Sequence, residues 1–90
     1  MPGTPLRLMS TAHCSACESA LDLLLGMPEL RGHVLSVIEV ADDERLLARY
    51  GERLPVLVAD ARELGWPFGR EQVRGLVGGL SEAPEDGTGV

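Results

Sequence analysis

The chain has 90 residues and a formal net charge of −6, and all eight of its basic residues are arginine. Ninety residues suit one domain with a small core, and an apolar content of 44% is too high for a disordered chain. The acidic balance argues against nucleic acid and membrane surfaces as partners, because both carry negative charge. No run approaches the ~18 apolar residues of a membrane span. The first residues also lack the pattern of a signal peptide, so we expect a cytoplasmic protein.

The first half of the chain predicts strand, helix, strand and helix. Residues 6–9 alternate apolar and polar side chains, as in a strand, and apolar residues recur at helical spacing over 15–25. Ser15 and Glu18 have capping-box spacing, which favours a helix start at Ser15. Residues 34–40 are rich in β-branched residues and apolar on both faces, which indicates a strand covered on two sides. A second helix is expected over 42–50, with Asp42 as its N-cap.

The second half predicts two antiparallel strands and a final helix. The strands are expected over 54–59 and 63–66, with a turn between them. Val73, Leu76, Val77 and Leu80 follow at helical spacing. Residues 81–90 are mostly glycine, proline and acidic side chains, which is typical of disorder. We therefore predict one domain over 1–80 and a disordered acidic tail over 81–90.

The only two cysteines, Cys14 and Cys17, lie between the first predicted strand and the first predicted helix. A Cys-x-x-Cys pair in that place is typical of thiol–disulfide chemistry. The N-terminus of a helix carries partial positive charge and free N–H groups, and both favour the reactive thiolate. We therefore predict that Cys14 is the attacking sulfur and Cys17 the resolving one. His13 is a candidate for tuning the Cys14 pKa, since an imidazolium beside the sulfur stabilises its thiolate.

The chain resembles the glutaredoxin-like group of thioredoxin-fold proteins, in particular the small bacterial glutaredoxin-like domains. The resemblance rests on the βαβαββα order, the cysteine pair after the first strand and Pro55 opening the third strand. The stretches ERLLARYG (44–51), LPVL (54–57) and ELGWPF (63–68) add to it. It implies an α/β fold, with a four-stranded mixed sheet and helices on both faces.

The resemblance also implies a substrate groove beside the cysteines. In this family the proline before the third strand is cis and faces the redox pair, so Leu54 and Pro55 are expected to shape the groove and Trp66 to border it. The implied activity is that of a monomeric thiol–disulfide oxidoreductase. The implied substrate is glutathione or a protein disulfide, with glutathione as co-substrate and no bound cofactor or metal.

Two other functions compete with this prediction. One is a non-catalytic binding module on the same fold, in which Cys17 is simply a small core residue. The other is soft-metal binding through Cys14 and Cys17, because the stretch HCSAC before a helix also resembles the copper chaperones. Those domains have a βαββαβ order and usually a methionine where this chain has Ala12. The helix expected over 42–50 therefore separates the two folds.

Overall fold

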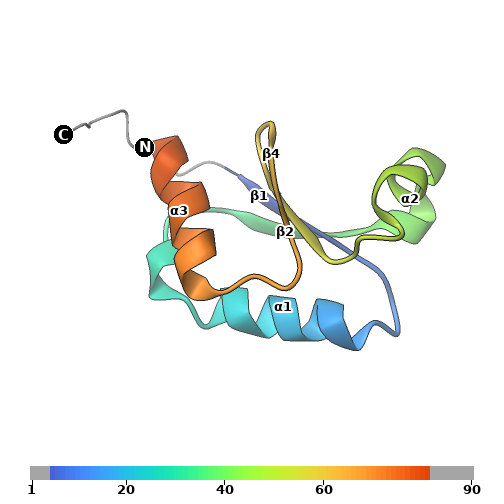
Figure 1. The fold of residues 1–90 in the computed structure, drawn as a ribbon, viewed down its shortest axis with the longest axis horizontal. Coiled ribbons are helices and arrows are strands. Elements are labelled where there is room, and N and C mark those ends of the chain that lie inside the picture. Colours follow the sequence, from blue (N-terminus) through green and yellow to red (C-terminus); the bar gives the residue numbers. More distant parts are fainter. Residues whose placement is uncertain (1–4, 82–90) are drawn as a thin grey trace.

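The structure is a computed structural model that describes residues 5–81. Its elements follow the predicted βαβαββα order, with two short 3-10 helices added (Figure 1). In chain order they are β1 (Leu6–Ser10), α1 (Ser15–Leu25), η1 (Pro28–Leu30), β2 (Leu35–Glu39), η2 (Val40–Asp42), α2 (Glu44–Tyr50), β3 (Val56–Ala59), β4 (Arg62–Gly65) and α3 (Arg70–Ser81). Ser81 thus ends α3, and the rest of the predicted tail lies outside the described residues.

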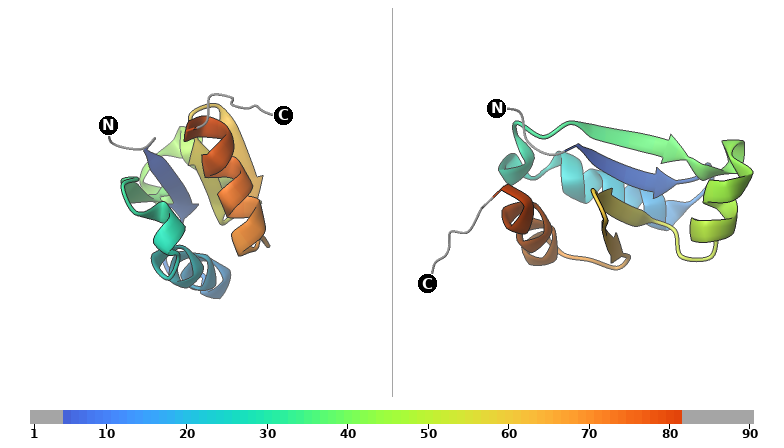
Figure 2. Two further views of the ribbon diagram at one scale, coloured as in Figure 1. Left: turned by 90° about the vertical axis from the view of Figure 1, so that its left-hand side faces the viewer. Right: turned by 90° about the horizontal axis from the view of Figure 1, so that it is seen from above.

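The four strands form one mixed sheet in the order β2-β1-β3-β4. Strands β1 and β2 are parallel, and α1 connects them, since parallel neighbours need a crossover. Strand β3 runs antiparallel to β1, and β4 runs antiparallel to β3. Helices α1 and α3 cover one face, while the short α2 lies at one end of the sheet (Figures 1 and 2). None of the helices within residues 5–81 is long and apolar enough to cross a membrane.

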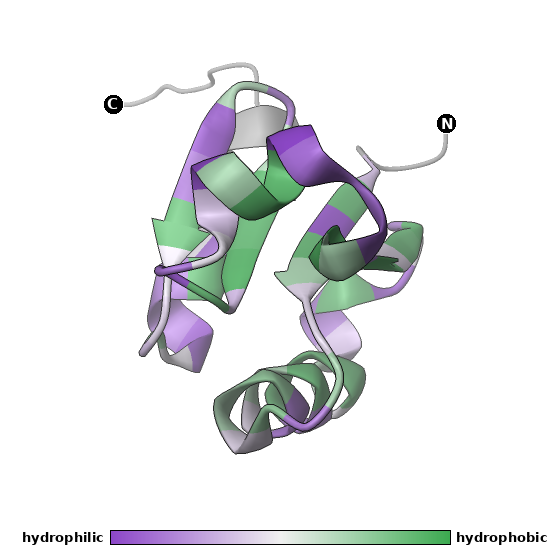
Figure 3. Ribbon diagram, turned by 90° about the vertical axis from the view of Figure 1, so that its right-hand side faces the viewer, coloured by the Kyte–Doolittle hydropathy of each residue, from purple (hydrophilic) through white to green (hydrophobic). Residues whose placement is uncertain are grey.

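The alternation of side chains along the central strands divides the core into two clusters. Leu8 and Leu57 belong to the cluster beneath α1 and α3, whereas Met9, Val56 and Val58 join Tyr50 of α2 on the opposite face. This arrangement follows from the period of two along a strand. The central strands are accordingly coloured as mostly hydrophobic in Figure 3.

Strand β2 differs from its prediction. We expected a strand covered on both faces, but β2 is at the edge of the sheet, and Ser36 and Val37 are exposed. Val37 retains 50% of its accessible surface. The apolar character of this segment reflects the β-propensity of its residues rather than burial on both sides.

The two predicted helix starts have different outcomes. Helix α1 begins at Ser15 as expected, with Cys14 as its N-cap, whereas the N-cap of α2 is Asp43 rather than the expected Asp42. Asp43 Oδ1 accepts hydrogen bonds from the backbone N–H groups of Arg45 (2.8 Å) and Leu46 (3.3 Å). Asp42 instead ends the preceding 3-10 helix.

The two neighbouring aspartates allow a direct test of the cap. We expect Asp43→Ala to lower the free energy of unfolding by about 1 kcal/mol, because two N–H groups of α2 lose their acceptor. Asp42→Ala is the matched control and is expected to change it by less than about 0.5 kcal/mol. Urea denaturation of both variants, followed by circular dichroism, measures the difference. Equal losses would mean that the cap contributes nothing specific to α2.

Candidate functional site

The cysteine pair lies where β1 ends and α1 begins. Cys14 and Cys17 form a disulfide, with their Cα atoms 5.2 Å apart. Cys17 is in the first turn of α1 and retains only 3% of its accessible surface, whereas Cys14 is half-buried. An incoming sulfur therefore reaches Cys14 far more easily than Cys17.

The backbone around Cys14 suits a negatively charged sulfur. As N-cap of α1, Cys14 has an extended backbone, and its Sγ accepts a hydrogen bond from the N–H of Cys17 at 3.1 Å. That N–H is one of the groups that a helix leaves without an internal partner at its N-terminus. The same N–H and the partial positive charge of the helix end favour a thiolate on Cys14 after reduction.

A carboxylate that was not predicted as a site residue links the loop that carries Cys14 to the end of β2. Glu39 lies opposite Ser10 in the parallel register, at the point where β1 leaves the sheet. Its pKa is lowered, chiefly by a hydrogen bond from the Thr11 side chain and further by the backbone of Ala41 and Ala12. Glu39 thus links β2 to the two residues that precede His13. The sequence gives only one indication of this role. Glu39 is an acidic residue at the end of β2, and β2 is parallel to β1, the strand that precedes the cysteines.

His13 directly precedes the nucleophile and is exposed. Its backbone is left-handed, with φ of 59°, a conformation that few non-glycine residues adopt. The turn at His13 brings the chain from the end of β1 to the start of α1. The role of His13 in tuning Cys14 stays a prediction.

The start of β3 meets the end of β1 at the same end of the sheet as the cysteines. Met9 pairs with Val56, so Pro55 lies one residue beyond that pair, beside the point where β1 leads into the cysteine loop. The Leu54–Pro55 peptide bond is cis, and Pro55 is fully buried. Leu54 is partly buried against the cluster that contains Tyr50. The topology therefore brings Leu54 and Pro55 to the cysteine end, although they are about 40 residues away in the sequence.

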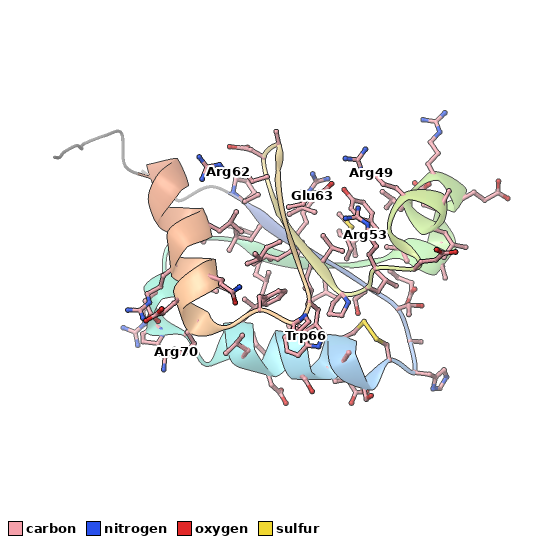
Figure 4. The ribbon with its side chains drawn as sticks, in the orientation of Figure 1. Arg49, Arg53, Arg62, Glu63, Trp66 and Arg70 are labelled. Carbon is pink, nitrogen blue, oxygen red and sulfur yellow. A yellow bond between two sulfur atoms is a disulfide. The ribbon has the colours of Figure 1, made fainter. Side chains whose placement is uncertain are left out.

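Trp66 follows β4 and lies between the end of that strand and α1 (Figure 4). It is partly buried against the core beneath α1, and its ring meets Phe68 edge-on at 5.0 Å between centroids. The N–H of Trp66 donates to the carbonyl oxygen of Pro55 at 3.2 Å. Trp66 therefore combines a packing role with a backbone contact to the predicted groove.

A second group of residues joins α2 to β4 and was not predicted from the sequence. Glu63 of β4 accepts hydrogen bonds from Arg49, Tyr50 and Arg53 (Figure 4). These three residues have a helix-like spacing in the sequence, but nothing there indicates a partner on β4. The pairing depends on the register that places Glu63 on the same face as α2.

A cavity of about 210 Å³ is separate from the cysteines. It lies at the far end of α1, between residues such as Leu24, Leu30 and Leu35.

The alternative of soft-metal binding can be compared with the structure. Within residues 5–81, no three His, Cys, Asp or Glu side chains are grouped so that they could hold a metal ion. The observed βαβαββα order also differs from the βαββαβ order of the copper chaperones.

The sheet topology and the Cys-x-x-Cys pair at the head of α1 define a thioredoxin-fold protein. Residues 5–77 match the model of the glutaredoxin-like domain (DUF836), and the chain belongs to this family. The predicted family and fold class are therefore confirmed.

Two solved structures are similar to this chain. Protein XcR50 from X. campestris is 31% identical, with a TM-score of 0.70 over 82% of this chain and 96% of that one. A mutant thioredoxin from Halobacterium salinarum NRC-1 is 20% identical, with a TM-score of 0.70 over 92% of this chain and 79% of that one. At 20% identity, the similarity to this thioredoxin shows only that the two proteins share a fold. No curated protein matches the sequence.

Proposed function

We propose that this protein is a thiol–disulfide oxidoreductase that exchanges its cysteine pair with a disulfide of glutathione or of a protein. The observation that carries the proposal is the unequal placement of the two sulfurs. Cys14 is half-buried at the N-terminus of α1, and Cys17 is buried beside it at 3% exposure. Such a pair suits a reaction in which one sulfur attacks from the surface and the other completes the exchange from within.

The reaction has two steps. The Cys14 thiolate attacks one sulfur of the substrate disulfide, which forms a mixed disulfide and releases the other substrate sulfur as a thiolate that takes up a proton. The Cys17 thiolate then attacks Cys14 Sγ, which forms the Cys14–Cys17 disulfide and releases the second substrate thiol. The substrate gains two electrons and two protons, and the protein loses them. A thiol reductant such as glutathione returns the protein to its dithiol form.

The surrounding residues have supporting roles in this proposal. Leu54 and Pro55 shape the groove in which an extended substrate pairs with the backbone, and Trp66 borders it. His13 stabilises the Cys14 thiolate when its imidazole is protonated. We propose that the protein acts as a monomer in the cytoplasm, where thiols are kept reduced between turnovers.

The pH dependence of Cys14 alkylation tests the proposal. In the reduced protein we expect iodoacetamide to modify Cys14 with a midpoint about one pH unit or more below the ~8.5 of a free thiol. Mass spectrometry of the modified peptide assigns the site, and Cys17→Ser removes any contribution from the second thiol. A midpoint at the ordinary value, or equal modification of both sulfurs, would contradict the proposal and favour a non-catalytic binding module.

A further inference from the structure

The four residues that follow α2 lead directly into the proposed groove at Pro55. Residues 51–54 leave α2 at Tyr50 and reach Pro55, and the N–H of Arg53 donates to the carbonyl oxygen of Tyr50 at 2.8 Å. Beyond this connection, Pro55 accepts the hydrogen bond from Trp66 of the segment that follows β4. The position of Leu54 and Pro55 is therefore set jointly by α2 and by β4.

Glu63 joins these two elements. Its Oε2 accepts hydrogen bonds from Arg49 Nη2 and from the Tyr50 hydroxyl, both at 2.9 Å. Its Oε1 accepts one from Arg53 Nη2 at 3.2 Å. Figure 4 shows Arg49 and Arg53 on the side of Glu63 that faces α2. One carboxylate thus binds the last turn of α2 and the residue next to Leu54.

The Glu63 carboxylate is partly shielded from solvent, whereas its two arginine partners are about half exposed or more. Its side chain is 24% exposed, and Val58, its neighbour on β3, is buried. The guanidinium groups of Arg49 and Arg53 lie 5.4 and 5.3 Å from the centre of the Tyr50 ring, which restricts both arginines. The hydrogen bonds from Arg49, Tyr50 and Arg53 lower the pKa of Glu63 to about 2, so it is ionised at every pH at which thiolate chemistry is assayed.

We propose that Glu63 is a positioning residue. Through Arg49, Tyr50 and Arg53 it holds Leu54 and Pro55 in place beside the cysteine pair. This proposal rests on the proposed function, because it assigns Glu63 an effect on the substrate groove and none on the sulfurs. Loss of the charge loosens the α2–β3 connection and weakens substrate binding. The intrinsic reactivity of Cys14 stays the same, since the helix N-terminus that activates it is untouched.

The test compares Glu63→Gln with a matched control, Glu29→Gln. Glu29 also pairs with two arginines, Arg70 at 3.4 Å and Arg74 at 3.5 Å, and it is 26% exposed. Its partners are on α3, which packs on the face of the sheet opposite to Glu63. The reduced proteins are mixed with excess peptide that carries a glutathione mixed disulfide, and thiol release is followed in a single turnover over a range of peptide concentrations.

For Glu63→Gln we expect the half-saturating peptide concentration to rise about fivefold, with the maximal rate within about twofold of wild type. The midpoint of Cys14 alkylation should stay unchanged, and Glu29→Gln should behave as wild type in each measurement. Thermal unfolding shows whether both variants are folded. Equal half-saturating concentrations in the two variants would overturn the positioning role, as would a shifted alkylation midpoint in Glu63→Gln.

Amide hydrogen exchange separates this proposal from the proposed function. The N–H of Trp66, which binds the Pro55 carbonyl, should exchange about fivefold faster in Glu63→Gln than in wild type or Glu29→Gln. If wild type releases no thiol from the peptide, the proposed function fails, and faster Trp66 exchange still supports Glu63 as the residue that holds this segment. Unchanged Trp66 exchange overturns the positioning role whatever the activity of the wild type.

Discussion

Replacing Cys14 by serine will slow thiol release from a peptide–glutathione mixed disulfide by about a thousandfold, to the rate of the uncatalysed reaction. The serine hydroxyl has nearly the same size as the thiol but is not ionised at neutral pH, so the first bond to the substrate sulfur does not form. Cys17→Ser should behave differently. Cys14 still attacks, but no second sulfur is within reach, and the mixed disulfide with the substrate remains on the protein.

Intact mass measurement separates these outcomes. We expect Cys17→Ser to carry one stoichiometric adduct on Cys14, and Cys14→Ser to carry none, because Cys17 retains only 3% of its accessible surface. Ser15→Ala is the control, since Ser15 is exposed and lies next to Cys14 without a sulfur of its own. An adduct on Cys17 in Cys14→Ser would reverse the assigned roles, and full release of both thiols by Cys17→Ser would show that Cys17 is not the resolving sulfur.

Local patterns predicted the parts of this fold that depend on nearby residues. The helix expected over 15–25 is α1 with the same bounds, because its apolar spacing and the glycine that follows it act within a few turns. The cysteine pair was placed correctly at the head of this helix for the same reason. The cap of α2 was wrong by one residue, because Asp42 and Asp43 have identical side chains. The preceding 3-10 helix occupies Asp42 and leaves Asp43 in the extended conformation of a cap.

Contacts between distant segments could not be predicted in this way. Glu39 reaches Thr11 and Ala12 only because β2 is parallel to β1 and in the register that pairs it with Ser10. Glu63 meets Arg49, Tyr50 and Arg53 only because β4 follows β3 in the sheet with its carboxylate on the α2 face. A single sequence contains no information on such registers beyond the alternation of apolar residues. Glu39 contacts the loop that precedes Cys14, and Glu63 contacts the connection that leads into the proposed groove.

The edge position of β2 has a measurable consequence for stability. Val37 and Leu57 lie in the same row across the sheet, because each pairs with Leu8 of β1. Leu57 is in the central strand β3 and is fully buried, whereas Val37 is 50% exposed at the edge. We expect Leu57→Ala to lower the free energy of unfolding by about 3 kcal/mol, through lost burial and the cavity left between its neighbours. Val37→Ala should cost less than about 1 kcal/mol.

The difference is large relative to the stability of a domain of this size, which is about 5–13 kcal/mol for 90 residues. Leu57→Ala is therefore expected to lower Tm by about 10–20 °C, while Val37→Ala shifts it by only a few degrees. Both variants are measured in the oxidised form, so that the disulfide is the same in each. Losses of similar size would mean that Val37 is covered in solution. Dilution then tests whether the cover is a second molecule, because in that case Tm depends on protein concentration.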